Sequence, residues 1–92
     1  MSAYVIVGFN PKNSEKLQAY SAAAGPIIAQ FQGEFVVKGQ SQQLFGESNY
    51  KMQVIIAFPT HSLAETWYNS PEYQALLPLR EQAMDAHFQL IG

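Results

Sequence analysis

Hydrophobic and polar positions alternate in four segments of the chain, as is typical of half-buried strands. The first segment places Val5, Val7 and Phe9 on one face and small or apolar residues on the other. Because apolar side chains occur on both faces of such strands, we expect both faces of the sheet to be covered. The predicted strands are residues 3–9, 34–39, 50–58 and 85–91.

Between the first two strands, apolar residues recur at spacings of three and four from Leu17 to Phe31. This period predicts one amphipathic helix over 14–31, capped by Asn13 or Ser14. The stripe keeps its phase across Gly25-Pro26, so we expect a kink there and not two helices. Gly33 is expected to supply the left-handed turn that ends the helix.

The region after the third strand predicts two further helical pieces. Ser62 is expected to cap the first, and Ser70 followed by Pro71 is the start signal of the second. The second piece is expected over 70–83 and to break near Pro78, because a proline inside a helix removes a hydrogen bond.

The resulting order is β-α-β-β-α-β, which predicts a single α+β domain over residues 1–92 with a ferredoxin-like fold. Four antiparallel strands would carry the helices on one face. The other face would be open in a monomer, although its residues are apolar. We therefore expect a homodimer in which two copies pack sheet on sheet around a two-fold axis.

The composition agrees with a small soluble protein that self-associates. Of 92 residues, 48% are apolar and only 13% are charged, with a net charge of −2. Without a basic patch, nucleic-acid binding is not expected, and without an apolar run of roughly 18–20 residues, neither is a membrane span. The absence of cysteine excludes disulfides and thiolate metal sites, and suits a reducing, cytoplasmic location.

Residues 70–83 (SPEYQALLPLREQA) raise the question of function. Tyr73 and Arg80 lie seven residues apart, so a helix would turn both toward the interior. Tyr20 on the first helix and Trp67 on the second can meet them there. One hypothesis is that Tyr20, Trp67, Tyr73 and Arg80 line a cavity that holds a small anionic ligand. The other is that they are packing residues at the border of helix and sheet.

Candidates for proton transfer are few. His61 and His87 are the only histidines, and Glu34 is a carboxylate that can point from a strand into the cleft. For each, a structural role is the competing interpretation. We expect no metal site, because no cluster of ligands has a suitable spacing, and no cofactor, because no phosphate or dinucleotide fingerprint is present.

Several stretches resemble the bacterial family called domain of unknown function 1330. They are Tyr4, Tyr20, QGEFVVKG at 32–39 and, most specifically, VIIAFPTHSLAETWYNSPEYQALLPLREQA at 54–83. The resemblance implies a dimeric α+β barrel. Fold relatives of this family include cofactor-free monooxygenases, muconolactone isomerase-like enzymes, haem-binding peroxidases and stress-responsive barrel proteins, whereas the family itself has no established reaction. It tends to carry a glutamate before the glycine of LFG at 44–46, where this chain has Phe45.

Two functional hypotheses follow. The first is a homodimer that binds a small organic ligand, expected to be anionic, between sheet and helices, with any chemistry being cofactor-free acid/base or oxygenase-type. The second is a non-catalytic dimer whose tyrosine–arginine cluster only fixes helix packing. A haem-linked activity is disfavoured, because neither His61 nor His87 lies in a helical axial-ligand context.

Overall fold

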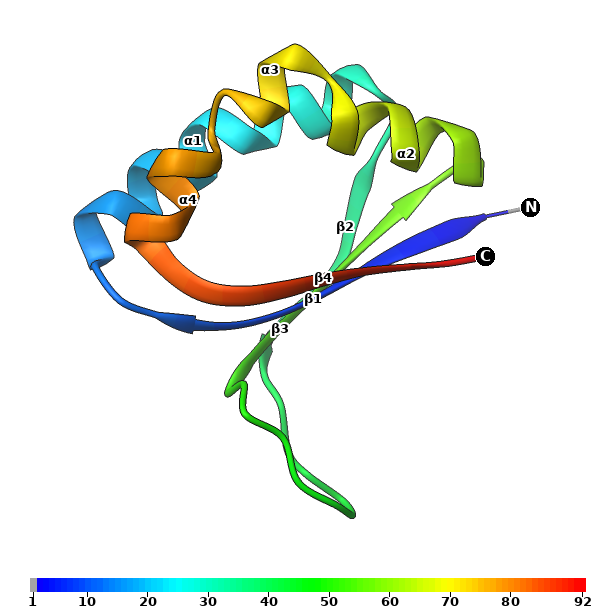
Figure 1. Ribbon diagram of the computed structural model, residues 1–92. Helices are drawn as coiled ribbons and strands as arrows, with labels where there is room; N and C mark the ends of the chain where they lie inside the picture. The colour runs from blue at the N-terminus through cyan, green and yellow to red at the C-terminus, as the bar shows by residue number, and fades with distance from the viewer. Residues whose placement is uncertain (1) are drawn as a thin grey trace.

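The computed structural model describes residues 2–92 of the chain. Figure 1 shows its elements, which confirm the four predicted strands and the helical segments between them. In chain order they are β1 (Ala3–Pro11), α1 (Ser14–Gln30), β2 (Glu34–Gln40), β3 (Met52–Phe58), α2 (His61–Asn69), α3 (Pro71–Gln74), α4 (Leu77–Ala83) and β4 (Met84–Ile91).

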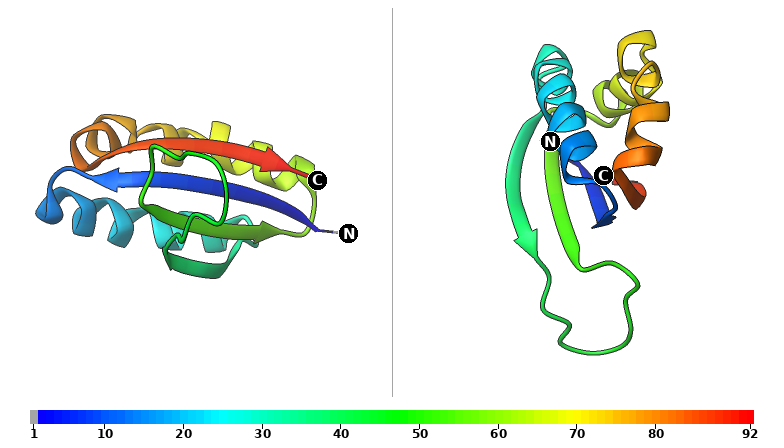
Figure 2. Two further views of the ribbon diagram at one scale, coloured as in Figure 1. Left: turned by 90° about the horizontal axis from the view of Figure 1, so that it is seen from below. Right: turned by 90° about the vertical axis from the view of Figure 1, so that its left-hand side faces the viewer.

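The strands form one antiparallel sheet in the order β2-β3-β1-β4. All the helices lie on one face of this sheet, as Figure 2 shows from two directions. The α+β ferredoxin-like fold that the β-α-β-β-α-β order of the predicted elements implied is therefore confirmed.

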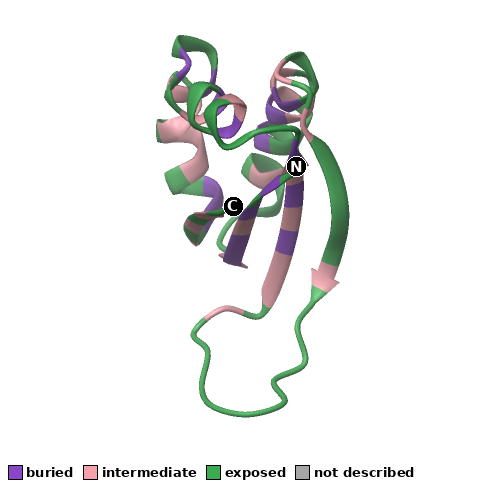
Figure 3. Cartoon of the chain, turned by 90° about the vertical axis from the view of Figure 1, so that its right-hand side faces the viewer, coloured by how far each residue is buried: buried purple, intermediate pink, exposed green. Residues whose placement is uncertain are grey.

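The alternation along β1 decides which side chains form the core. Val5, Val7 and Phe9 point toward the helices and are buried. Tyr4 and Ile91 pair across β1 and β4 and remain exposed on the opposite, outer face. Figure 3 shows that exposure continues along β2 and the loop beyond it.

Helix α1 is one continuous element that contains Pro26, as its unbroken apolar stripe predicts. Asn13 caps it, since its side-chain oxygen accepts from the Lys16 N–H at 3.0 Å. Within residues 2–92, neither α1 nor any other helix has the length and apolar character to cross a bilayer.

The turn after α1 differs from the prediction. Gln32, with φ of 67°, takes the left-handed conformation, and Gly33 does not. Gly33 is needed for space instead, because a Cβ there would lie 2.6 Å from Ile28 Cγ2 and 2.8 Å from the Phe58 ring. The sequence signal for a glycine was correct, but its physical cause is close packing.

Two substitutions at this turn should have opposite effects. Gln32→Gly should stabilise the protein by about 1 kcal/mol, because glycine relieves the cost of the left-handed conformation. Gly33→Ala should destabilise it by about 2 kcal/mol, because the buried Ile28 and Phe58 must move. Urea unfolding of both variants measures the difference; equal midpoints for the two would contradict this account of the turn.

The start of α2 needs correction, whereas Ser70 and Pro71 begin α3 and the chain breaks near Pro78 as predicted. Thr60, not Ser62, caps α2, with its hydroxyl accepting from the Leu63 N–H at 3.1 Å. Pro59 follows the last strand residue, so the chain uses the first capping residue that is available. Residues 70–83 divide between Gln74 and Leu77, before Pro78, which lies in the first turn of α4. The Pro78 ring would meet the carbonyl of Gln74 in a continuous helix, so Pro78 begins the second piece.

Candidate functional site

A cavity of about 260 Å³ lies between α1 and the sheet. Its walls are mostly apolar, because side chains from all four strands and the buried stripe of α1 meet there. Its lining residues are Val7, Phe9, Leu17, Tyr20, Ser21, Ala24, Ile28, Phe35, Lys38, Val54, Ile56, Trp67, Met84 and Phe88.

The exposed lining residues locate the mouth of this cavity. Ser21 on α1 and Phe35 and Lys38 on β2 are exposed, whereas the other walls are buried or half-buried. The cavity therefore opens at the seam between α1 and the edge strand β2. Lys38 places a positive charge at this opening.

Four side chains form a hydrogen-bonded network behind one wall of the cavity. Arg80 Nη1 donates to the Tyr73 hydroxyl at 3.1 Å and to the Tyr68 hydroxyl at 3.2 Å. The hydroxyls of Tyr73 and Tyr20 are 2.6 Å apart. The guanidinium also lies over the Phe88 ring, 4.6 Å from its centroid. The network thus joins α1, α2, α3, α4 and β4.

Either tyrosine hydroxyl can be the donor of the bond between them, and the other bonding partners favour one direction. Tyr73 is 0% exposed, and within residues 2–92 its hydroxyl has no acceptor except Tyr20. A buried O–H without an acceptor costs about 1–3 kcal/mol, so Tyr73 donates to Tyr20. Tyr20 must then direct its own proton elsewhere. Because Tyr20 lines the cavity, its hydroxyl can donate to an acceptor placed there.

The ionisation of both tyrosines is suppressed. Burial raises the pKa of the Tyr20 hydroxyl far above its ordinary value, and the neighbouring Tyr73 raises it further. Burial also raises the pKa of Tyr73, against the opposing hydrogen bonds from Tyr20 and Arg80. Burial alone would lower the pKa of the Arg80 guanidinium, but its bonds to Tyr73 and Tyr68 raise it overall. The pair of tyrosines is therefore a neutral donor chain beside a permanent cation.

These shifts predict a loss of stability at high pH. In the unfolded chain a tyrosine ionises near pH 10, whereas in the folded chain Tyr20 and Tyr73 keep their protons. Their contribution to the free energy of unfolding is therefore complete below about pH 10 and declines above it. The decline should be about 1.4 kcal/mol per pH unit for each hydroxyl that stays protonated.

Urea unfolding between pH 9 and pH 11.5 measures this slope. Tyr20→Phe should reduce it, because one of the two protonated hydroxyls is gone. An equal slope in wild type and Tyr20→Phe would contradict the raised pKa of Tyr20.

The four predicted ligand residues do not share one cavity. Tyr20 and Trp67 line it, but Tyr73 and Arg80 are not among its lining residues. The expectation that Tyr73 faces an empty space was wrong, because its ring packs against Trp67 at 4.6 Å and Tyr68 at 5.3 Å between centroids. Arg80 is half-buried and reaches the cavity only through Tyr73 and Tyr20.

Tyr68 belongs to the network but was not predicted as a site residue. Neighbouring residues on a helix would be expected to point apart, but the Tyr68 ring lies edge-on to Trp67 with centroids 5.8 Å apart. The turn at Ser70 and Pro71 then brings α4 back beside Tyr68. A hydroxyl-bearing ring five residues before Tyr73 was the one signal available. It had no meaning until the position of the turn was known.

Trp67 contributes a further polar atom to this region. The residue is 1% exposed, and its Nε1 has no hydrogen-bond partner within residues 2–92. Buried indole N–H groups normally donate a hydrogen bond. Trp67 therefore leaves an open donor in a side chain that lines the cavity.

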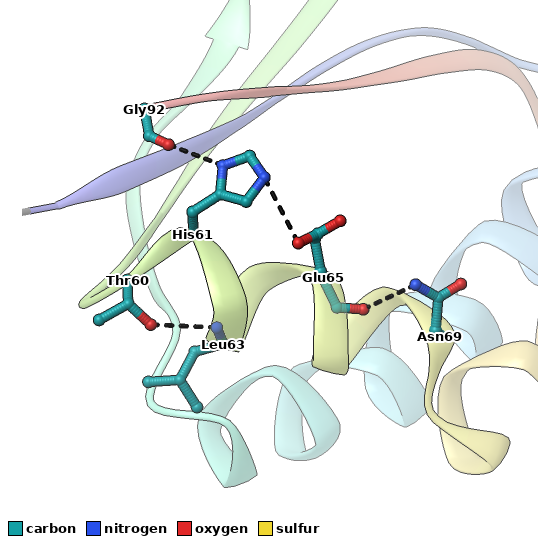
Figure 4. Close-up of polar contacts among 6 residues, drawn as sticks. All are labelled: Thr60, His61, Leu63, Glu65, Asn69 and Gly92. Atoms are coloured by element: carbon teal, nitrogen blue, oxygen red, sulfur yellow. Dashed lines mark hydrogen bonds and ion pairs between the residues drawn. The ribbon is translucent and has the colours of Figure 1, made fainter.

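His61 lies apart from this cavity, at the start of α2. Its Nδ1 is 2.7 Å from the Gly92 carbonyl oxygen, and its Nε2 is 3.5 Å from a Glu65 carboxylate oxygen. Figure 4 shows the ring held between these two groups. Both nitrogens thus have structural partners, and the ring ties the end of β4 to α2.

The other two proton-transfer candidates also lie away from the cavity. His87 is on the outer face, where its ring packs at a tilt against Tyr50 with centroids 4.5 Å apart. Its Nε2 would lie 2.8 Å from a Cβ placed on Gly8. Glu34 is exposed at the start of β2, opposite Ala57. The structure therefore does not bring His61, His87 and Glu34 together. No group of three metal-ligating side chains occurs within residues 2–92.

Sequence comparison identifies a family over nearly the whole chain. The model described as "Domain of unknown function (DUF1330)" matches residues 2–92. Among curated proteins, none matches this chain.

Solved structures share the fold at low sequence identity. A protein of unknown function from Rhodopseudomonas palustris has a TM-score of 0.80 and 17% identity, over 98% of this chain and 80% of its own. A dimeric ferredoxin-like protein of unknown function from Jannaschia sp. CCS1 has a TM-score of 0.74 and 13% identity, over 100% and 99% of the two chains. SnoaB, a cofactor-independent oxygenase from Streptomyces nogalater, has a TM-score of 0.71 and 11% identity, over 99% and 91%. At these identities the likeness shows the fold alone.

Proposed function

The chain belongs to the DUF1330 family of unknown function, and on that premise we propose that it binds a small, mostly apolar molecule carrying an oxygen acceptor in the cavity under α1. The acceptor is a carboxylate or phenolate oxygen that accepts a hydrogen bond from the Tyr20 hydroxyl. The single observation that carries this proposal is the Tyr73–Tyr20 hydrogen bond, which leaves Tyr20 with a proton to donate at a cavity wall.

The chemistry of the walls supports an aromatic acid as the class of ligand. Ligand cavities are typically apolar with a few placed polar groups, and a dry cavity of about 150 Å³ already holds a benzene ring. A volume of about 260 Å³ therefore suits one or two rings. Lys38 at the mouth favours a negative charge on the molecule that enters.

A thermal-shift panel tests this proposal. The probes are benzoate, salicylate, 1-naphthoate and 1-naphthol, applied to wild type, Tyr20→Phe and Tyr4→Phe. A ligand of the native state raises the melting temperature in proportion to RT ln(1 + [L]/Kd). At least one probe should stabilise wild type and Tyr4→Phe, whose hydroxyl lies on the outer face, but stabilise Tyr20→Phe much less. A panel without effect on wild type would contradict the proposal.

The proposed function does not include an acid–base step through a histidine. His61, His87 and Glu34 do not line the cavity, so none is positioned to move a proton of a ligand bound there. The oxygenase activity of the Streptomyces nogalater protein accordingly adds no catalytic residue to this proposal.

The protein also acts as a homodimer in this proposal, with the outer sheet faces packed together. The centre of that face carries Ile6, Ile55 and Val37 in one row across three strands. Exposed apolar surface of this kind favours association, and structural neighbours are described as dimeric. Sedimentation should give twice the chain mass for wild type and the single mass for Ile55→Glu.

One observation favours the second function, a dimer in which the cluster only fixes helix packing. Arg80 contacts α2 and α3 through hydroxyls and β4 through the Phe88 ring, as a structural clamp would. The panel separates the two functions. If Arg80 substitutions destabilise the protein and no probe shifts wild type, the packing role is sufficient.

A further inference from the structure

The loop between β2 and β3, residues 41–51, carries the two most exposed large hydrophobic side chains within residues 2–92. Leu44 is 90% exposed and Phe45 is 94% exposed. They are adjacent, and Gly46, with φ of +81°, turns the chain directly after them. We call residues 41–51 the arm.

The arm has a defined direction. Its base is closed by the Ser41 N–H, which donates to the Lys51 carbonyl at 2.9 Å. Asn10 on β1 binds the returning limb of the arm at two points. Its Nδ2 donates to the Asn49 carbonyl at 2.6 Å, and its Oδ1 accepts from the Lys51 N–H at 2.8 Å. At the tip, Gln43 Nε2 donates to the Phe45 carbonyl at 2.8 Å.

This direction leads away from the helices. Figures 1 and 3 both show the arm projecting beyond the outer face of β1 and β4, on the side opposite the helical layer. The arm therefore lies on the side where a second copy packs in the proposed dimer.

The length of the arm decides how far it reaches. A limb from Ser41 to Phe45 spans at most about 17 Å. Sheets packed face to face lie about 10 Å apart. In a sheet-on-sheet dimer a limb of this length is therefore long enough for the tip to pass the level of the partner sheet and contact the side of the partner subunit.

We propose that the arm is an intersubunit clasp, in which Leu44 and Phe45 of each copy pack on the side of the other copy beyond its sheet. The inference rests on the proposed sheet-on-sheet dimer. Leu44 and Phe45 are exposed in one copy and would be removed from water by contact with the other copy, which is favourable for apolar side chains. Two-fold symmetry makes this contact occur twice in the dimer.

Photocrosslinking of the full chain tests the clasp. Benzoylphenylalanine placed at Phe45 should give a covalent species of twice the chain mass after irradiation. The matched control places it at Gln30, which is exposed on α1 in the helical layer. Crosslinks from both positions alike, or from neither, would overturn the clasp.

The dimer dissociation constant gives a second readout. Leu44→Ser with Phe45→Ser should raise it about 100-fold, whereas Gln42→Ser on the same arm should leave it unchanged. Unaltered melting temperatures at high concentration show that the variants fold. A wild type that is monomeric throughout would overturn the dimer and the clasp together. A wild-type dimer with the same dissociation constant in the apolar arm variant would overturn the clasp alone.

Discussion

Trp67→Ala should lose about 3–5 kcal/mol of unfolding free energy, the largest effect that we expect from one substitution in this chain. A domain of this size has roughly 5–14 kcal/mol in total, so the variant should be close to unfolding at 37 °C. The reason is the position of the ring. It is 1% exposed and packs against Phe58 and Tyr73, with centroids 5.3 Å and 4.6 Å away.

Trp67→Phe is the control for this prediction. It keeps an aromatic ring between Phe58 and Tyr73 and removes the indole N–H, which has no partner within residues 2–92. Relief of an unpaired donor opposes the loss of volume, so the variant should stay within about 1 kcal/mol of wild type. Urea unfolding measures both. Equal losses in the two variants would contradict this prediction, because an aromatic ring retained between Phe58 and Tyr73 would then contribute no stability.

Arg80→Met should lose about 3 kcal/mol, the second largest expected effect. Methionine retains much of the apolar stem but removes two hydrogen bonds from a charged donor and the contact with the Phe88 ring. Arg80→Lys should recover less than half of this loss. An ammonium has no flat fork that can serve two hydroxyls while it lies on a ring.

Two comparisons make the Arg80 prediction specific. Lys16→Met, at an exposed position of α1, removes a cation outside the network and should change stability by less than about 0.5 kcal/mol. A double-mutant cycle of Arg80→Met with Tyr73→Phe should give a coupling energy of about 1–2 kcal/mol. Additive losses in that cycle would mean that Arg80 acts through the Tyr68 hydroxyl and the Phe88 ring and not through the Tyr73 hydroxyl.

Periodicity was sufficient to predict the elements of the fold but not the details at their ends. The alternation of Val5, Val7 and Phe9 identified the buried face of β1, because burial is what produces the alternation. The ends depended on competition between neighbouring signals. Thr60 and Ser62 are both good caps, and at the end of α1 the left-handed conformation falls on Gln32, whereas Gly33 is required by the space that Ile28 and Phe58 leave.

The sequence predicted which residues belong to the candidate site but not the hydrogen bonds that join them. Their spacing predicted that Tyr73 and Arg80 point inward, and in the structure Arg80 Nη1 donates to the Tyr73 hydroxyl at 3.1 Å. Spacing within one helix cannot show that Tyr20, 53 residues away, satisfies the buried hydroxyl. The separation into a cavity wall at Tyr20 and a buried support at Tyr73 and Arg80 therefore needed the three-dimensional structure.

One NMR titration can decide whether the Tyr20 hydroxyl donates a hydrogen bond to a ligand in the cavity under α1. It compares the tightest-binding acid of the panel with its methyl counterpart, such as benzoate with toluene, in wild type and Tyr20→Phe. The account predicts that the acid loses about tenfold or more in affinity in Tyr20→Phe, as expected for one hydrogen bond to a charged group. The hydrocarbon should bind both proteins within about twofold. An equal loss for acid and hydrocarbon, or no binding of any acid to wild type, would contradict the claim.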